Sequence, residues 1–443
     1  MKQRVCVCFP LLFLIVLLLC HCAGQTSAPV HVKDGKEYGK VRGAFRHRWW
    51  NYYERGLSYA DGAFYGEAGA DLREAISRRK KDQRMARTYG MHFMDYFPHR
   101  ELGVVQYELG NLDEARAELE MSLSQFPSAK ARFYLDRVRK GLLEASGGSA
   151  MPPKLTLGIE SEEVWTKEDP VILTGVAEDE QYVAAINISG APLFIESSQK
   201  RISFKEPLDL SQGRHLVVVK AKNLLGKEAQ RQVTIHVDRE GPVVTLEEIK
   251  TKPGGIAISG FVYDDAGVSA LSVSGQPVAL PPGTDVPFKA TVSSDGDPIQ
   301  LVATDRLGNE TSADVPYISP ARSAARPFGH RPVLLAMGGS ENQAMFLAGL
   351  FGSGDAGPPV VRLKGWTKTQ TVYMGKVYIE GEVSDDTKVV TLSVNGVPVL
   401  RREGVSIVFN QLIDLKEGKN TILVEAADEA GNKAVEEISI TRE

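Results

Sequence analysis

Acidic side chains recur at corresponding positions in the C-terminal part of this 443-residue sequence. Three related stretches each contain an acidic pair: Asp179-Glu180, Asp264-Asp265 and Asp385-Asp386. Further along, Asp305 and Asp428 each stand three residues before a Gly in a Gly-Asn pair. Calcium prefers oxygen ligands, so these carboxylates are candidate metal ligands. The same residues also suit hairpin turns, because Asp bonds to nearby backbone amides and Gly or Asn accepts a left-handed conformation.

The sequence offers little else that indicates catalysis. It contains no Gly-x-Ser-x-Gly elbow, no phosphate-binding loop and no dinucleotide fingerprint. Its four cysteines all lie within the first 24 residues, at Cys6, Cys8, Cys20 and Cys22. The rest of the chain therefore has no thiolate nucleophile, no cysteine-based zinc site and no disulfide. We expect a protein that is not an enzyme and has no cofactor besides weakly bound calcium.

The N-terminal end has the pattern of a secretory signal. Lys2 and Arg4 precede an apolar run from Phe9 to Cys20, and small residues follow it. This pattern predicts a signal peptide over residues 1–24 and export to the periplasm or the cell surface. The run is only slightly shorter than a membrane span, so an anchor formed by residues 5–20 is the alternative. A membrane is expected as a partner only through such an uncleaved segment.

Residues 40–146 are expected to form helices, because apolar residues recur at spacings of three and four and proline is scarce. The stretch "LGVVQYELGNLDEARAELEMSLSQFP" resembles a tetratricopeptide repeat, with Leu102, Gly103, Gly110, Leu112, Ala115, Leu119 and Pro127 at matching offsets. An earlier stretch matches at Gly56, Tyr59, Tyr65, Ala68, Leu72 and Ala75. His99 and Ser122 depart from the family pattern, where a large aromatic residue and alanine are usual. The second of these repeats lies unusually far from the first, which predicts an insertion around residues 80–99.

The resemblance implies binding of a protein partner in a helical groove. Aromatic residues of the repeat and the insertion are candidate partner contacts: Tyr59, Tyr89, Phe93, Tyr96 and Phe97. The alternative is that these side chains complete the core of a module too small to close with two repeats. Lys and Arg outnumber Asp and Glu in residues 40–145, which favours acidic peptides and gives no basis for nucleic-acid binding.

After a Gly/Ser/Pro-rich stretch the sequence alternates as strands do, and three segments align from Gly175, Gly260 and Gly381. Each has a second Gly followed by Pro, and each ends in an Ala-containing strand and a Gly turn. These segments resemble bacterial immunoglobulin-like domains, including the glucodextranase-type accessory domain. The resemblance implies three all-β sandwiches, over residues 152–238, 240–318 and 360–443. Residues 319–359, rich in Gly, Ala and Pro, are expected to be a linker that also contains apolar runs.

In an immunoglobulin-like sandwich the loop between strands B and C and the loop between F and G lie at the same end. The resemblance therefore implies that Asp385, Asp386 and Asp428 meet in the third domain, and that Asp264, Asp265 and Asp305 meet in the second. The first domain has neutral Asn223 at the position of the last Asp. We expect weak calcium binding in the second and third domains only, with a plain hairpin turn as the alternative.

The whole chain is thus predicted to be multidomain, with an all-α, tetratricopeptide-like module followed by three immunoglobulin-like sandwiches. We expect a scaffold of the bacterial cell envelope whose helical module binds a protein and whose β-domains act as spacers or adhesion units. The alternative is an accessory protein that binds carbohydrate or cell wall, an envelope polysaccharide, through the β-domains.

Overall fold

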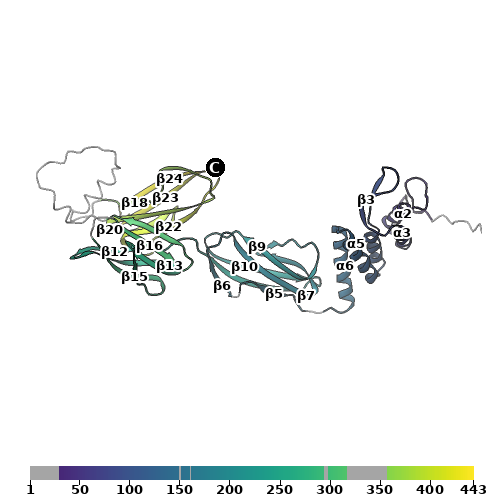
Figure 1. Cartoon of the computed structure of the whole chain (residues 1–443), viewed down its shortest axis with the longest axis horizontal. Coiled ribbons are helices and arrows are strands. Elements are labelled where there is room, and N and C mark those ends of the chain that lie inside the picture. Colours follow the sequence, from purple (N-terminus) through teal and green to yellow (C-terminus); the bar gives the residue numbers. More distant parts are fainter. Residues whose placement is uncertain (1–28, 149–150, 160, 294–297, 317–356) are drawn as a thin grey trace, which may run out of the picture. The chain divides into compact units, whose positions relative to one another are not determined.

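The computed structural model describes residues 29–148, 151–159, 161–293, 298–316 and 357–443. The predicted signal peptide and residues 319–356 of the predicted linker lie outside this range. Helices occupy the N-terminal part and strands the remainder, which confirms the predicted change from helix to strand (Figure 1). No helix within the described residues is both long and apolar enough to span a membrane.

The helical part consists of paired helices and two small strand hairpins. The helices are α2 (Trp49–Asp61), α3 (Tyr65–Arg78), α4 (Pro98–Glu108), α5 (Leu112–Gln125) and α6 (Ala129–Ala145). The hairpins are β1 (His31–Lys33) with β2 (Lys36–Tyr38), and β3 (Gln83–Arg87) with β4 (Phe93–Tyr96). The β3–β4 hairpin lies between α3 and α4, within the predicted insertion.

Small residues set the spacing of the helix pairs, as the repeat pattern predicts. A Cβ atom added at Gly103 of α4 would lie 2.6 Å from Cγ of Leu119 of α5. A Cβ atom at Gly56 of α2 would lie 3.1 Å from Cγ of Leu72 of α3. A larger side chain at Gly103 would therefore overlap Leu119, and one at Gly56 would press against Leu72. Proline opens α4 at its first residue, and the side chain of Ser128 accepts a hydrogen bond from the N–H of Ala131 to cap α6.

The first group of strands forms one seven-stranded sheet. Its members are β5 (Lys154–Leu157), β6 (Glu163–Thr166), β7 (Val171–Ile188), β8 (Ala191–Pro192), β9 (Gln199–Leu208), β10 (Gly213–Asn223) and β11 (Glu228–Val237). The main path runs β5-β7-β10-β11-β6, with β8 and β9 paired to β7. β7 and β10 are antiparallel, whereas β11 and β6 are parallel.

The second and third groups together form a thirteen-stranded sheet. The second group comprises β12 (Val243–Lys252), β13 (Gly255–Val273), β14 (Gln276–Val278), β15 (Gly283–Val292), β16 (Ile299–Asp305) and β17 (Glu310–Val315). The third comprises β18 (Val360–Leu363), β19 (Thr369–Val372), β20 (Lys376–Val394), β21 (Val397–Pro398), β22 (Gly404–Asp414), β23 (Gly418–Asp428) and β24 (Lys433–Arg442). The first and third groups share a feature, because β19 pairs in parallel with β24 as β6 does with β11.

Strand pairing joins the second and third groups. β12 pairs with β13 of its own group and also, in antiparallel register, with β22 of the next, where Val244 faces Val408. Val408 is fully buried and belongs to the apolar core of the second group. The third group keeps a core of its own, which includes Phe409 and Ile440. The sequence-based expectation of separate sandwiches did not include this shared sheet.

The three aligned glycines stand where a neighbouring residue leaves no room for a side chain. A Cβ atom at Gly260 would lie 1.9 Å from the carbonyl oxygen of Thr245, and one at Gly381 would lie 2.6 Å from that of Arg362. At Gly175 it would lie 2.3 Å from Cζ of Phe204. The repeated glycine is therefore a packing requirement.

The described chain divides into two compact units. The first contains residues up to Thr156 together with Val176–Ser203 and Val219–Arg231. The second contains Leu157–Gly175, Phe204–Val218 and the chain from Gln232 to Glu443. The sites described below each lie within one unit.

Candidate functional site

The predicted partner contacts divide between the core and the surface of the helical part. Tyr59, Tyr96 and Phe97 are buried, and the first two belong to an apolar core shared with α2, α3 and α4. Their polar ends are satisfied internally, since the hydroxyl of Tyr59 donates to the carbonyl of Pro29 and that of Tyr96 donates to the carbonyl of Arg79. These three residues fill the core, which is the alternative that the sequence left open.

Tyr89 and Phe93 are exposed, by 61% and 43%, and both belong to the β3–β4 hairpin. Met85 and Met91 of the same hairpin are also exposed, by 64% and 82%. Four large apolar side chains thus reach solvent within a nine-residue stretch, from Met85 to Phe93. Exposed apolar patches on folded proteins often mark interaction surfaces.

The opposite face of the hairpin is buried in the helical core. Ala86 and Tyr96 are fully buried, and Met94, which faces Ala86 in the ladder, packs partly against the same core. At the far end of β4, the N–H of Phe97 donates to the hydroxyl of Tyr53 at 3.2 Å. The hairpin is therefore held on one face and free on the other.

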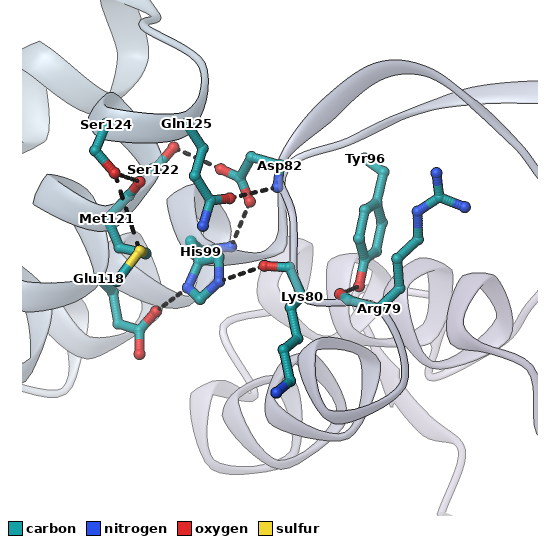
Figure 2. Close-up of polar contacts among 10 residues, drawn as sticks. All are labelled: Arg79, Lys80, Asp82, Tyr96, His99, Glu118, Met121, Ser122, Ser124 and Gln125. Atoms are coloured by element: carbon teal, nitrogen blue, oxygen red, sulfur yellow. Dashed lines mark hydrogen bonds and ion pairs between the residues drawn. The ribbon is translucent and has the colours of Figure 1, made fainter.

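Asp82, the residue before β3, ties the hairpin to α4 and α5. Figure 2 shows its carboxylate accepting hydrogen bonds from the N–H of His99 (3.0 Å) and from the hydroxyl of Ser122 (2.6 Å). Its own N–H donates to the side chain of Gln125 at 2.7 Å. The two departures from the repeat pattern, His99 and Ser122, are thus the residues that receive the insertion.

The His99 ring lies between two acceptors. Its Nδ1 is 2.6 Å from Oε2 of Glu118, and its Nε2 is 2.9 Å from the carbonyl oxygen of Lys80 (Figure 2). Both nitrogens carry a proton when both bonds form. Burial opposes the charge, but the bonds to Glu118 and Lys80 outweigh it and raise the pKa of His99.

A serine, an aspartate and a histidine come together here, but their hydrogen bonds hold the hairpin in place and do not form a catalytic triad. The hydroxyl of Ser122 donates to Asp82, and both nitrogens of the His99 ring are engaged by other groups. A nucleophilic serine needs a histidine nitrogen free to accept its proton. This arrangement positions the hairpin and cannot activate Ser122.

The second unit brings three buried carboxylates together. Oxygen atoms of Asp238, Asp264 and Asp305 lie within 4.8 Å of one another. Asp264 lies in β13 and Asp305 ends β16, so the predicted meeting of these two residues is observed. Asp238 follows β11 and was not expected from the sequence. Asp265, which was expected here, is exposed and accepts a hydrogen bond from the hydroxyl of Tyr263.

Backbone and amide donors orient each carboxylate. The N–H of Gly267 donates to Asp264, and Asn309 donates to Asp305 through both its N–H and its side chain. Asp238 accepts from the side chain of Gln212 at 2.8 Å. Among the described residues, no Lys or Arg forms an ion pair with any of the three.

The electrostatics follow from burial and mutual repulsion. Burial raises the pKa of Asp264 to about 8, and the nearby charges of Asp238 and Asp305 add to the effect. Burial also raises the pKa of Asp238. Glu240, two residues further along, is partly buried; desolvation and the nearby charges of Asp238 and Asp265 raise its pKa to about 7. Close carboxylates of this kind either retain a proton or bind a cation.

The corresponding positions in the third group are less concentrated. Burial raises the pKa of Asp385, and Asp386 and Asp428 add to the effect. Asp385 accepts from Thr387, Asp428 accepts from Asn432, and Asp386 is exposed. No third carboxylate joins Asp385 and Asp428 within the described part of the chain.

Asp238 has a counterpart in the sequence before the third group. Asp238 stands four residues before a Pro-Val-Val run, and Asp355 stands four residues before another. Asp355 lies outside the described residues. In the first group, an amide takes the position that Asp305 has in the second: the side chain of Asn223 donates hydrogen bonds to the side chains of Asp179 and Gln181.

Comparisons with known proteins find no matching family model and no matching curated protein. Three of the similar solved structures are the mixed-linkage glucan protein SGBP-B of Bacteroides ovatus, a bacterial ice-binding adhesin, and the fibronectin(III)-like modules of CbhA from Clostridium thermocellum. SGBP-B is 12% identical and the match covers 66% of this chain and 71% of SGBP-B. The adhesin is 17% identical, with 67% of this chain and 100% of the adhesin covered. The CbhA modules are 14% identical, with 44% of this chain and 93% of the modules covered. The TM-scores are 0.15, 0.22 and 0.15, so the similarities carry no conclusion about ligand or activity.

Proposed function

We propose that this chain is a non-enzymatic interaction protein, exported to the cell envelope, whose helical part binds a protein partner through the β3–β4 hairpin. The observation that carries the proposal is the exposure of Met85 and Phe93 on the strands, and of Tyr89 and Met91 in the turn, of a hairpin whose other face is buried. A rigid surface loses little conformational entropy on binding, so its apolar area converts efficiently into affinity. The β-domains act as a spacer, and the pairing of β12 with β22 stiffens it.

The test compares the mature wild-type chain with a Tyr89→Ser/Phe93→Ser variant. Each is immobilised and exposed to envelope extract, and the protein retained by the wild type is identified, purified and titrated against both. We expect the variant to bind at least about tenfold more weakly, as the loss of interface anchors does. Tyr373→Ser is the matched control, because Tyr373 is a 77% exposed aromatic residue of the β region.

Equal binding by the wild type and the hairpin variant would refute the hairpin as the partner surface. If binding were instead lost in Tyr373→Ser, or followed residues 152–443 in truncated chains, the carbohydrate- or wall-binding alternative would take its place.

We also propose that Asp238, Asp264 and Asp305 bind a divalent cation such as calcium, with Asp385 and Asp428 as a weaker second site. The observation that favours it is a set of three buried carboxylates with two raised pKa values and no ion-pairing Lys or Arg among the described residues. Calcium accepts six to eight oxygen ligands, and water with backbone carbonyls would complete the set. Asp265 and Asp386, both exposed, would contribute through the field of their charge rather than as ligands.

A further inference from the structure

The β3–β4 hairpin is an open sheet. Within the described residues, β3 pairs only with β4 and β4 only with β3, so each strand has an outer edge. An edge strand presents unpaired N–H and C=O groups that can pair with another chain. Two-stranded ribbons are marginal by themselves, and a third strand stabilises them. This hairpin is therefore suited to receive an additional strand.

The edge is already fixed in position before any partner arrives. The buried face is anchored by Ala86 and Tyr96, and the base is held by the Asp82 network (Figure 2). At the tip, the N–H of Thr88 donates to the carbonyl of His92, and Gly90 supplies a left-handed residue at φ 57°. The register shifts within β3 between Gln83 and Ala86, where Met85 has φ 51° and its N–H donates to Asp95, so the added strand would pair along β4. The backbone of β4 is already positioned, which reduces the entropy lost on binding.

The side chains around the free face specify an apolar partner. Met85, Tyr89, Met91 and Phe93 supply unbranched and aromatic surface, and the ring of Trp50 lies 6.3 Å from that of Tyr89. Methionine adapts its shape to the groups that contact it, and tyrosine and tryptophan are common interface anchors. Alternate residues of an added strand would place apolar side chains against these groups.

The charges specify an acidic partner. Lys80, Lys81, Arg84 and Arg87 are exposed on and next to the hairpin. The one carboxylate on the hairpin is Asp95, which accepts a hydrogen bond from the N–H of Met85 and lies 4.0 Å from Arg84. Complementary charges across an interface favour association and reject partners of like charge.

We infer that an extended segment of a protein partner, rich in acidic and apolar residues, adds to the β3–β4 hairpin as a third strand. The inference rests on the proposed function and deepens it, since it names the chemistry and the backbone conformation of the partner. It requires no change of the hairpin itself, only pairing along an edge that has no partner strand within the described residues.

The experiment selects displayed random peptides on the full mature chain and synthesises the enriched sequences. We expect alternating acidic and apolar residues among them. Binding to the Arg84→Glu/Arg87→Glu variant should weaken by about tenfold or more, and binding to Tyr373→Ser should not change. In a series of peptides N-methylated at one residue each, loss of affinity should alternate along the sequence, because alternate amides of an added strand donate to the edge.

The outcomes separate this inference from the proposed function. Peptides whose binding depends on Tyr89 and Phe93 but tolerates N-methylation at every position would overturn the third strand and leave the hairpin as a partner surface. Enriched peptides whose binding ignores both hairpin variants would overturn both proposals. Sedimentation with phosphatidylglycerol vesicles, in the absence of any enriched peptide, would assign the surface to a membrane and overturn the inference.

Discussion

Replacing Asp264 with Asn tests the candidate metal site most directly. The substitution removes one of three buried ionisable carboxyl groups and keeps an oxygen that can accept the hydrogen bond from the N–H of Gly267, at 2.9 Å in the wild type. Two opposite effects should follow. The variant should be more stable than the wild type in chelator, and it should lose the stabilisation that calcium gives to the wild type.

The size of the first effect follows from the pKa. Burial and the neighbouring carboxylates raise the pKa of Asp264 from 3.8 to about 8. At about 1.36 kcal/mol for each unit, the shift corresponds to roughly 6 kcal/mol. This is an upper bound, because the native protein relieves the repulsion by taking up a proton or a cation. We expect Asp264→Asn to gain on the order of 2 kcal/mol near pH 8 in chelator.

The pH dependence has a definite sign. A carboxyl group whose pKa is raised in the folded state binds its proton more tightly there than in the unfolded chain. Its stabilising contribution is present below about pH 4 and is lost as the pH rises toward about 8. Without metal, the wild type should therefore lose stability across this window, and Asp264→Asn should lose less.

Calcium should restore the stability of the wild type. If the dissociation constant is about 0.1 mM, within the range of extracellular sites, roughly 2 mM calcium adds about 1.8 kcal/mol. Calorimetric unfolding of the mature chain, with calcium and with chelator, measures both effects. Asp265→Asn is the matched control, because Asp265 is the adjacent acidic residue and is exposed; its melting should respond to calcium as the wild type does.

The reasoning fails if Asp264→Asn melts below the wild type in chelator at pH 8, because the three carboxylates would then not repel one another in the native state. It also fails if the variant keeps the full response to calcium. A wild type that does not respond to calcium, beside a more stable Asp264→Asn, would mean that the cluster holds a proton and no metal.

Three further predictions concern the rest of the chain. Burial lowers the pKa of His99, but its bonds to Glu118 and Lys80 outweigh burial and raise it. Protonated His99 should therefore stabilise the helical part below about pH 6.5, and this stabilisation should be lost as the pH rises through the folded-state pKa. The His99→Gln variant should lack this pH dependence of stability, which hydrogen exchange of α4 and α5 would measure. Gly103→Ala should destabilise the helical part by about 1–3 kcal/mol, because the new Cβ would lie 2.6 Å from Cγ of Leu119. Gly66→Ala is the control and should not destabilise it, because a Cβ atom there meets nothing within 4 Å. Chemical denaturation of both variants would test this prediction. The exported protein should begin near Gln25 and contain no thiol, which N-terminal sequencing and a thiol assay would establish; an intact Met1 start would contradict it.

The proposed partner surface was only partly predictable from the sequence. Five aromatic residues were equivalent candidates in the sequence, yet Tyr59, Tyr96 and Phe97 are core residues and Tyr89 and Phe93 are not. Alternation in a strand indicates which residues share a face, but the helices packed against the hairpin decide which face is buried. The departures from the repeat pattern at His99 and Ser122 were the sequence signal for where the insertion packs, because both residues donate hydrogen bonds to the carboxylate of Asp82.

The carboxylate cluster was predictable in part for a similar reason. Asp264 and Asp305 belong to one β-domain, and the resemblance to a known sandwich implied that they lie at the same end. The expectation of a loop at Asp264 was wrong, because β13 runs through this residue without a break, whereas Asp305 ends β16. Asp238 comes from the segment that follows β11, and no local pattern indicates that this segment lies against the loops of the next group. Asp264 and Asp265 are adjacent in a strand, so their side chains point to opposite faces. The side chain of Asp264 is buried in the cluster, and that of Asp265 is exposed.

The sequence by itself determined the features that depend on neighbours along the chain. Apolar spacing set the helices, period-two alternation set the strands, and close packing required Gly103 and Gly260, which the repeats already marked. Only the tertiary structure decided the pairing of β12 with β22, the burial of Tyr96 and the approach of Asp238 to Asp264. Those contacts join residues far apart in the chain, and their formation depends on the packing of complete elements, which no local pattern records.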